Sequence, residues 1–235
     1  MFDSYLGESI LGRAIKEKKI SVSFVNPRKF VSGKYKKVWP DGNVSLQIDE
    51  RPYAGGPGMV MMAEPVIKAV EFVRASISKR FLKSSDERGQ GARLKKSSRN
   101  LRPNILIINF VPSAEKFTTD AAKKISKKYT DVILICGRYE GIDARVDKIL
   151  KTKKYSIGDY VLTGGEIPAM ILIDSISRQI EGVLGNFNSR EEERVSSSEV
   201  YTRPEVLIFN KKKYKVPAVL LSGDHKKIEE WKKSK

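Results

Sequence analysis

The stretch LICGRYEGIDARV, residues 134–146, contains the change of pattern that decides the fold. Its first residues complete a short apolar run, DVILIC (131–136), which stops at Gly137. A second run of this kind, NILIINF (104–110), lies upstream. Short, continuously apolar runs are typical of strands that are buried on both faces of a parallel sheet. The two runs therefore predict neighbouring strands of an α/β fold.

The segments around these runs complete the predicted sheet. The residues between the runs predict a helix over about 113–128 with lysines on its outer face, which gives a βαβ unit. A third apolar segment, YVLTG, ends at Gly164–Gly165 and is expected to be a further strand. It leads into EIPAMILIDSISRQI (166–180), which predicts a helix with an early proline.

The rest of the chain gives shorter patterns. Apolar spacing predicts a helix over 4–18, and alternation in ISVSFVN predicts a strand over 20–26. PDGN predicts a turn, and a long helix is expected to begin at Pro65. Two polar stretches without periodicity, 83–103 and 186–199, are interpreted as connectors, and KKIEEWKKSK (226–235) predicts a final helix.

Composition limits the function classes. Lys and Arg outnumber Asp and Glu by 45 to 28, a net charge of +17, which favours a polyanion such as nucleic acid over a merely solvated basic surface. One cysteine, Cys136, and one histidine, His225, exclude a disulfide framework or a Cys/His zinc site within one chain. The N-terminus lacks the pattern of a signal peptide and no apolar run has the length of a membrane span, so we expect a cytoplasmic protein.

The turn after the second strand carries opposite charges around Gly141, namely Arg138, Glu140, Asp143 and Arg145. It is either a salt-bridged turn or a ligand-binding loop, because ligands of open α/β sheets bind at the carboxyl ends of the strands. GGPG (55–58) is suited to close backbone contact with a phosphate, but neither a Walker A loop nor a G-x-G-x-x-G strand–helix motif is present.

Four motifs in order carry a family resemblance: RPYAGGPGMVM (51–61), ICGRYEGIDARV (135–146), YSIGDYVLTGGEIPAMILIDSISR (155–178) and YTRPEVL (201–207). Together they closely resemble the bacterial tRNA (guanine-N1)-methyltransferase family, commonly called TrmD. The resemblance implies an α/β-knot (SPOUT) fold with a deep trefoil knot, which chain periodicity does not predict. It also implies S-adenosylmethionine as methyl donor, a homodimer with active sites at the interface, and methylation of N1 of the guanine just 3′ of the anticodon.

The resemblance also implies site residues. The methyl-donor pocket would be formed by Pro112, Gly137, Tyr139, Glu140, Ile157, Gly158, Tyr160, Leu162, Gly164, Gly165 and Pro168. The tRNA would be bound by Asp49, Arg51, Gly55, Gly56, Tyr201 and Arg203. The paired glycines at 164–165 are expected to allow close backbone contact or a positive φ. Arg138, Asp143 and Arg145 serve either this site or a structural ion pair.

The chemistry requires a base for the guanine N1 proton and a positive group for the charge that develops on O6. By resemblance, Arg178 stabilises O6. The family's base is an aspartate in the interdomain connector, but this connector has none, and counting from Gly185 places Glu193 there. Glu191 and Glu192 are rivals, and Asp49 and Asp174 are further carboxylates near the site. Magnesium is a family requirement for which this sequence shows no ligand cage.

The expected organisation is a methyltransferase domain over 1–185, with insertions at about 39–48 and 83–103, a connector over 186–200, and a shortened C-terminal helical tRNA-binding domain over 201–235. The chain begins near the turn that ends the family's usual first strand, and VPSAE (111–115) differs from the usual turn at the adenine. Two alternatives remain open: a catalytically silent knotted RNA-binding relative, and a related methyltransferase of ribosomal RNA.

Overall fold

The computed structural model describes residues 1–53, 55–89, 103–185 and 199–234. The chain forms two compact units, Met1–Val183 and Leu184–Lys235. The first unit is a mixed α/β structure built on a parallel sheet, and the second is a small α+β structure. No helix among the described residues is long and apolar enough to cross a membrane.

The sheet of the first unit has three parallel strands in the order β6-β5-β7. They are β5 (Ile105–Phe110), β6 (Asp131–Ile135) and β7 (Lys153–Tyr155). The two apolar runs are β5 and β6, so that prediction is confirmed. The third strand is not where it was predicted: YVLTG forms no strand, and the edge of the sheet is the Lys-Lys-Tyr segment of β7.

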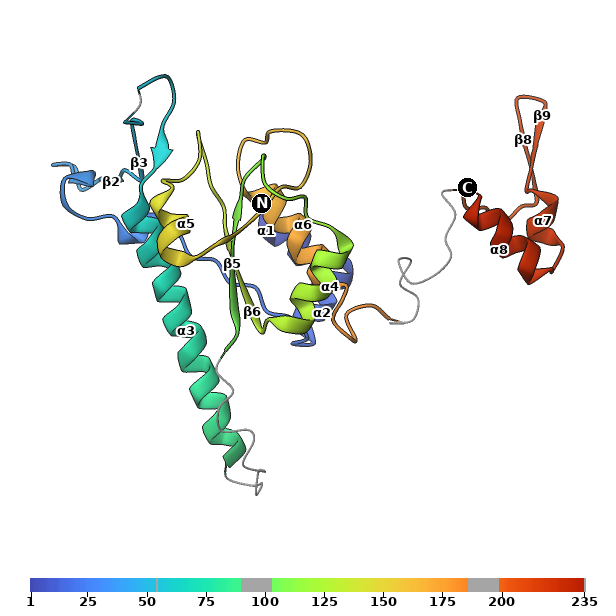
Figure 1. Cartoon of the computed structure of the whole chain (residues 1–235), viewed down its shortest axis with the longest axis horizontal. Coiled ribbons are helices and arrows are strands. Elements are labelled where there is room, and N and C mark those ends of the chain that lie inside the picture. Colours follow the sequence, from blue (N-terminus) through green and yellow to red (C-terminus); the bar gives the residue numbers. More distant parts are fainter. Residues whose placement is uncertain (54, 90–102, 186–198, 235) are drawn as a thin grey trace. The chain divides into compact units, whose positions relative to one another are not determined.

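Two helical layers cover the sheet (Figure 1). On one face, α3 (Ala63–Gly89) and α5 (Arg145–Leu150) bury Val66, Val70, Val146 and Leu150 against Ile107, Ile133 and Ile135. On the other, α4 (Thr119–Lys128) and α6 (Glu166–Ser177) bury Ile125 and Leu172 against Ile108 and Tyr155. Adjacent isoleucines of β5 thus enter opposite cores, which explains why its sequence is apolar without alternation.

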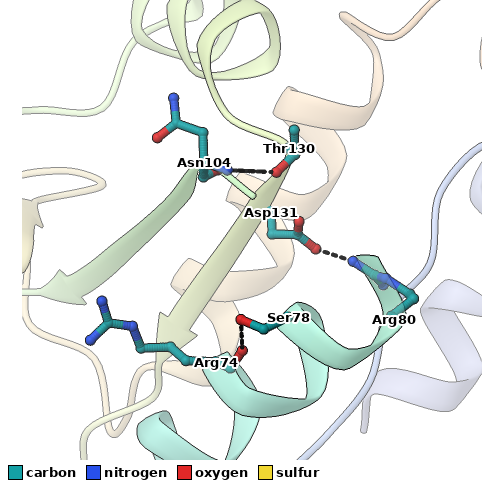
Figure 2. A network of polar contacts seen from close by, with 6 residues as sticks. All are labelled: Arg74, Ser78, Arg80, Asn104, Thr130 and Asp131. Carbon is teal, nitrogen blue, oxygen red and sulfur yellow. Dashed lines mark hydrogen bonds and ion pairs between the residues drawn. The ribbon is translucent and has the colours of Figure 1, made fainter. Parts of the chain in front are cut away.

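The long helix α3 begins two residues before the proline predicted to start it. Pro65 lies in its first turn, where a backbone N–H has no intrahelical partner to lose. The helix continues to Gly89, so the first part of the predicted connector at 83–103 is helical, while 90–102 lies outside the described residues. Figure 2 shows the amino end of the sheet beside it: Arg80 is paired with Asp131, and Asn104 N–H donates to Thr130 Oγ1 at 3.1 Å.

The N-terminal segment differs from its prediction in two respects. The helix expected over 4–18 is broken at Gly7–Glu8 into α1 (Phe2–Leu6) and α2 (Ser9–Lys16). Residues 20–26 form no strand, because no described segment pairs with their backbone. Phe24 instead lies against Phe2, with ring centroids 4.8 Å apart. Two 3₁₀ turns follow, η1 (Pro27–Phe30) and η2 (Gly33–Tyr35).

Two short hairpins lead to the candidate site. The PDGN turn joins β1 (Lys36–Val38) to β2 (Val44–Leu46), as predicted, with Trp39 N–H donating to the Asn43 carbonyl at 2.8 Å. Next, β3 (Asp49–Glu50) pairs antiparallel with β4 (Val60–Met61). The intervening loop contains the GGPG motif, with Ala54 outside the described residues.

The second unit contains one hairpin and two helices. The strands are β8 (Val206–Phe209) and β9 (Lys212–Lys215), which the sequence reading did not predict. They are followed by α7 (Ala218–Leu221) and α8 (His225–Lys233), and α8 matches the predicted final helix to within two residues at its end. Asp224 caps α8 by accepting a hydrogen bond from Lys227 N–H at 3.2 Å.

Candidate functional site

The carboxyl ends of β5, β6 and β7 bring three loops together. Val111 N–H donates to the Tyr155 carbonyl at 3.0 Å, and Ser156 N–H donates to the Glu115 carbonyl at 2.9 Å. Gly165 N–H donates to the Gly137 carbonyl at 2.9 Å. These contacts join segments 111–117, 137–143 and 156–165 at the carboxyl ends of the strands, where open α/β folds bind ligands.

A fourth segment, residues 55–62, lies against the loop after β6. Glu140 N–H donates to the Met59 carbonyl, Met61 N–H to the Gly141 carbonyl, and Asp143 N–H to the Met61 carbonyl, each at 3.0 Å. Gly58 has a φ of +90°, and a Cβ there would lie 2.6 Å from Glu140 Cγ. Only glycine allows this approach, so the GGPG motif and GRYEGID form one continuous backbone surface.

The charges of the opening stretch form ion pairs of two kinds. Asp143 and Arg145 are paired within the turn, with Nη2 2.5 Å from Oδ2, and Arg145 holds the pKa of Asp143 below its ordinary value. Arg138 instead spans two segments: its Nη2 lies 2.8 Å from Glu166 Oε1 in the first turn of α6. The turn is therefore salt-bridged at Asp143 and Arg145, Arg138 pairs with a different element, and Glu140 forms no ion pair with any residue that the structure describes.

Gly165 is placed by close packing and not by an unusual backbone angle. Its φ is −81°, and a Cβ there would lie 2.7 Å from Cys136 Cα and 2.9 Å from the Gly137 nitrogen. The expectation of a positive φ at this pair is thus wrong, and the expected backbone contact with a ligand stays a prediction. Burial, together with Glu166, raises the pKa of the Cys136 thiol to about 12, so this cysteine is not a thiolate nucleophile.

Hydrogen bonds also stiffen the loop that follows β7. Ser156 is buried, its Oγ donates to the Gly158 carbonyl at 2.9 Å, and it accepts from Gly158 N–H at 3.2 Å. Lys116 is paired with Asp159 at 2.5 Å. Neither Ser156 nor Lys116 was singled out in the sequence, since a serine before a glycine turn and a surface lysine are common in loops.

Helix α6 carries two further polar groups of interest. The Tyr5 hydroxyl, from α1, donates a hydrogen bond to Asp174, and this bond raises the pKa of Tyr5. Arg178 follows one turn later at the end of α6, with its N–H donating to the Asp174 carbonyl at 3.0 Å. Tyr5 was not predicted as a site neighbour, because only the fold brings α1 beside α6.

Comparison with known proteins identifies the family that shares these motifs. The model of tRNA (guanine-1)-methyltransferase TrmD matches residues 1–235. The chain is 39% identical to the tRNA (guanine-N(1)-)-methyltransferase of Clostridioides difficile over 99% of its length and 86% of that protein. It is 36% identical to the enzyme of that name from Pseudoalteromonas atlantica, over 99% of this chain and 74% of that protein. The chain belongs to the TrmD family.

TrmD membership implies S-adenosylmethionine as methyl donor, and the loops at the carboxyl edge fit it. Tyr139, Tyr160 and Leu162 are exposed there and offer aromatic and apolar surface for an adenosine. The Glu140 carboxylate, at the Gly58 contact, is suited to a sulfonium or an amino group. Exposed rings beside a carboxylate therefore match a nucleoside that carries a positive sulfonium.

The predicted pocket residues lie on the converging segments, and the predicted tRNA-binding residues are divided between the two units. Asp49 is in β3 and Arg51 directly follows it, while Gly55 and Gly56, both with positive φ, are in the adjoining loop. Tyr201 and Arg203 are in the second unit, where the Tyr201 hydroxyl donates to Glu199 at 2.9 Å. Pro168, predicted for the methyl-donor pocket, is buried in the first turn of α6. The other residues predicted for that pocket lie in the three loops that follow β5, β6 and β7: Pro112, Gly137, Tyr139, Glu140, Ile157, Gly158, Tyr160, Leu162, Gly164 and Gly165.

Glu193, with Glu191 and Glu192, lies outside the described residues. In the parts of the chain that the structure describes, no group of three His, Cys, Asp or Glu side chains is placed to hold a metal ion. Magnesium therefore stays a prediction.

Proposed function

We propose that this TrmD-family chain methylates N1 of the guanine immediately 3′ of the tRNA anticodon, with S-adenosylmethionine as donor. The observation that carries the proposal is the convergence of segments 55–62, 137–143 and 156–165, each from one of the family's motifs, into one hydrogen-bonded surface. The full-length family match and relatives bearing that enzymatic name support it.

The donor pocket consists of the three edge loops. When bound, S-adenosylmethionine supplies an electrophilic methyl group. The glycine turns at 137 and 164–165 would line the pocket, and the exposed rings of Tyr139 and Tyr160 would contact the nucleoside. Arg138, paired with Glu166, fixes the loop after β6 to α6, so that the pocket is preorganised for positioning of the methyl group.

The chain's own charged residues act on the guanine. Glu193 accepts the N1 proton, because the reacting lone pair becomes available as that proton leaves. Arg178, at the end of α6, stabilises the negative charge that develops on O6. Asp174, hydrogen-bonded to Tyr5 one turn before Arg178, and Asp49 in β3 are the alternative bases to be tested.

The proposal includes a SPOUT α/β-knot fold and a homodimer with shared active sites. The dimer is supported by exposed apolar side chains on α6 and the loop before it: Ile167 and Ile171, one helical turn apart, and Val161, which is 81% exposed. Helices that keep apolar side chains on the surface beside a site are suited to a subunit interface.

The direct test is methyl transfer from labelled S-adenosylmethionine to two tRNA transcripts that differ only in the nucleotide 3′ of the anticodon. We expect label on the transcript with guanine and background on the one with adenine. Equal labelling of both would show a different target. Binding without labelling would favour the catalytically silent relative, and labelling of a ribosomal RNA fragment alone would favour the third hypothesis.

A further inference from the structure

Asn109 is a polar residue near the end of an otherwise apolar strand, β5. Strand alternation places it on the same face as Ile107, toward α3 and α5, and it is only 6% exposed. A side-chain amide buried without a partner is costly, so an acceptor is required at this point of the core. The acceptor is Asp147 of α5: Asn109 Nδ2 donates to its Oδ1 at 2.9 Å.

The Asp147 carboxylate accepts from three segments of the chain. Besides Asn109, Thr152 Oγ1 donates to Oδ1 at 2.6 Å, and Lys154 Nζ lies 2.9 Å from Oδ2. Burial acts to raise the pKa of Asp147, but these hydrogen bonds outweigh it and hold the pKa below its ordinary value. One ionised side chain of α5 therefore joins the end of β5, the turn after α5, and β7.

Strand β7 has little else to hold it on this face of the sheet. It has three residues, pairs only with β5 among the described strands, and buries only Tyr155. Short elements with few buried contacts can open locally while the rest of a fold stays intact. Because Asn109 and Lys154 are direct partners in the β5–β7 ladder, Asp147 holds the two strands in register at that row.

The position of β7 determines the position of two donor loops. Segment 156–165 begins at the residue after Tyr155. Lys153, the other lysine of β7, is paired at 2.7 Å with Glu115 of segment 111–117. An opening of β7 would therefore displace both loops. Donor affinity falls in proportion to the fraction of molecules in which the binding loops are in place.

We propose that Asp147 is a positioning residue for methyl-donor binding: by tying β7 to β5 and α5, it keeps the loops joined to β7 in the arrangement that S-adenosylmethionine requires. This inference rests on the proposed function, because the donor is a substrate of that same reaction. Since Asp147 acts only through β7, its loss should change the affinity for the donor and not the chemical step.

The test compares two aspartates of similar burial at opposite ends of the sheet. The side chain of Asp147 is 15% exposed, and that of Asp131, paired with Arg80 at the amino end (Figure 2), is 14% exposed. In Asp147→Asn, an NH₂ group replaces one accepting oxygen and meets another donor. Titration calorimetry should show the Kd for S-adenosylmethionine raised on the order of tenfold, and Asp131→Asn should stay within about twofold of the wild type.

Kinetics and hydrogen exchange distinguish positioning from general stability. In Asp147→Asn, the KM for S-adenosylmethionine should rise while kcat at saturating donor stays nearly unchanged. The amides that pair β7 with β5 should exchange faster, and those that pair β5 with β6 should not. Asp131→Asn should lower the unfolding temperature without altering this KM.

Lys154→Met is a second variant for the case that Asp147→Asn does not fold. Lys154 is 46% exposed, so its replacement is tolerated by the core, and the Kd for the donor should rise by a smaller factor in the same direction. Unchanged donor affinity in folded Asp147→Asn or in Lys154→Met would overturn the inference, as would an equal loss in Asp131→Asn. A wild-type protein that does not bind S-adenosylmethionine would instead refute the proposed function, and this inference with it.

Discussion

At the residue scale, the base is the group on which the chemistry depends most directly. A glutamate can replace the family's aspartate, because the ordinary pKa values of the two carboxyls differ by about half a unit. Glutamate also reaches about one bond further than aspartate. The run Glu191–Glu193 is otherwise only a group of charges, so the assignment has to be tested one residue at a time.

Glu193→Gln should lower the rate of methyl transfer by a factor on the order of 10² to 10⁴, the usual effect of losing a general base. Affinity for S-adenosylmethionine, measured by calorimetry, should stay nearly unchanged because the proposed donor pocket is formed by other loops. Glu191→Gln and Glu192→Gln are the matched controls and should remain active. A dead Glu192→Gln beside an active Glu193→Gln would shift the assignment by one residue, and activity in the triple variant would move the base to Asp49 or Asp174.

The two adjacent glycines of the third loop should respond differently to alanine. At Gly165 the new Cβ would meet the backbone of Cys136 and Gly137, which cannot move without shifting the end of β6. At Gly164 it would meet the side chains of Glu166 and Arg138, which can rotate away. Gly165→Ala should therefore lower the unfolding free energy by about 1–3 kcal/mol and weaken S-adenosylmethionine binding strongly.

Gly164→Ala serves as the control for that variant and should have a smaller effect on both quantities. Thermal unfolding and titration calorimetry of the two proteins make the comparison. Equal behaviour of the two variants would show that the packing of Gly165 against β6 does not shape the donor pocket.

At the scale of elements, α6 joins the donor pocket to the proposed subunit interface. Its first turn holds Pro168 in the core and Glu166 against Arg138, while Ile167 and Ile171 remain 45% and 38% exposed. An apolar pair of this kind on a helix that begins at the ligand loop is expected to be covered by a second copy of the chain.

Ile167→Glu should convert the dimer to a monomer in sedimentation at micromolar concentration, because a carboxylate would be buried without a partner. Methyl transfer should fall with the dimer. Val38→Glu is the matched control: Val38 is 65% exposed in β1, outside the proposed interface, and the variant should stay dimeric and active. A wild-type protein that is fully active as a monomer would refute the shared site.

The elements also show what sequence patterns can and cannot predict. β5 and β6 are predictable because they are buried on both faces and therefore uniformly apolar. β7 is a three-residue edge strand with only Tyr155 buried, too short to leave a periodic signal. Residues 20–26 alternate like a strand, but alternation does not supply a partner for their backbone.

In the site, too, some features leave a pattern in the sequence and others depend on the fold. Glycine turns at strand ends are visible in the sequence, and motif resemblance assigns them to one pocket. The pairing of Arg138 with Glu166, and of Tyr5 with Asp174, depends on which elements the fold brings together. Arg145 pairs with Asp143, two residues away, whereas Arg138 pairs with Glu166, 28 residues away. The spacing of charges in the sequence does not predict which of these two kinds of pair an arginine forms.

At the scale of the whole molecule, a first unit with a ligand edge and a second unit with an exposed basic hairpin suit an enzyme that acts on a large polyanion. The net charge of +17 provides long-range attraction, whereas the loops at the carboxyl edge provide the chemistry. We propose that recognition of tRNA and transfer of the methyl group belong to different parts of the chain, so that each can be altered separately.

The most direct test of this account is the identity of the methylated nucleoside. A tRNA transcript with guanine 3′ of the anticodon is incubated with the protein and S-adenosylmethionine, digested to nucleosides and separated by liquid chromatography with mass spectrometry. The account predicts 1-methylguanosine as the only new nucleoside, because the proposed base takes the N1 proton and the proposed arginine stabilises the charge that then develops on O6. A ribose-methylated nucleoside, or a guanosine methylated at another position, would contradict it.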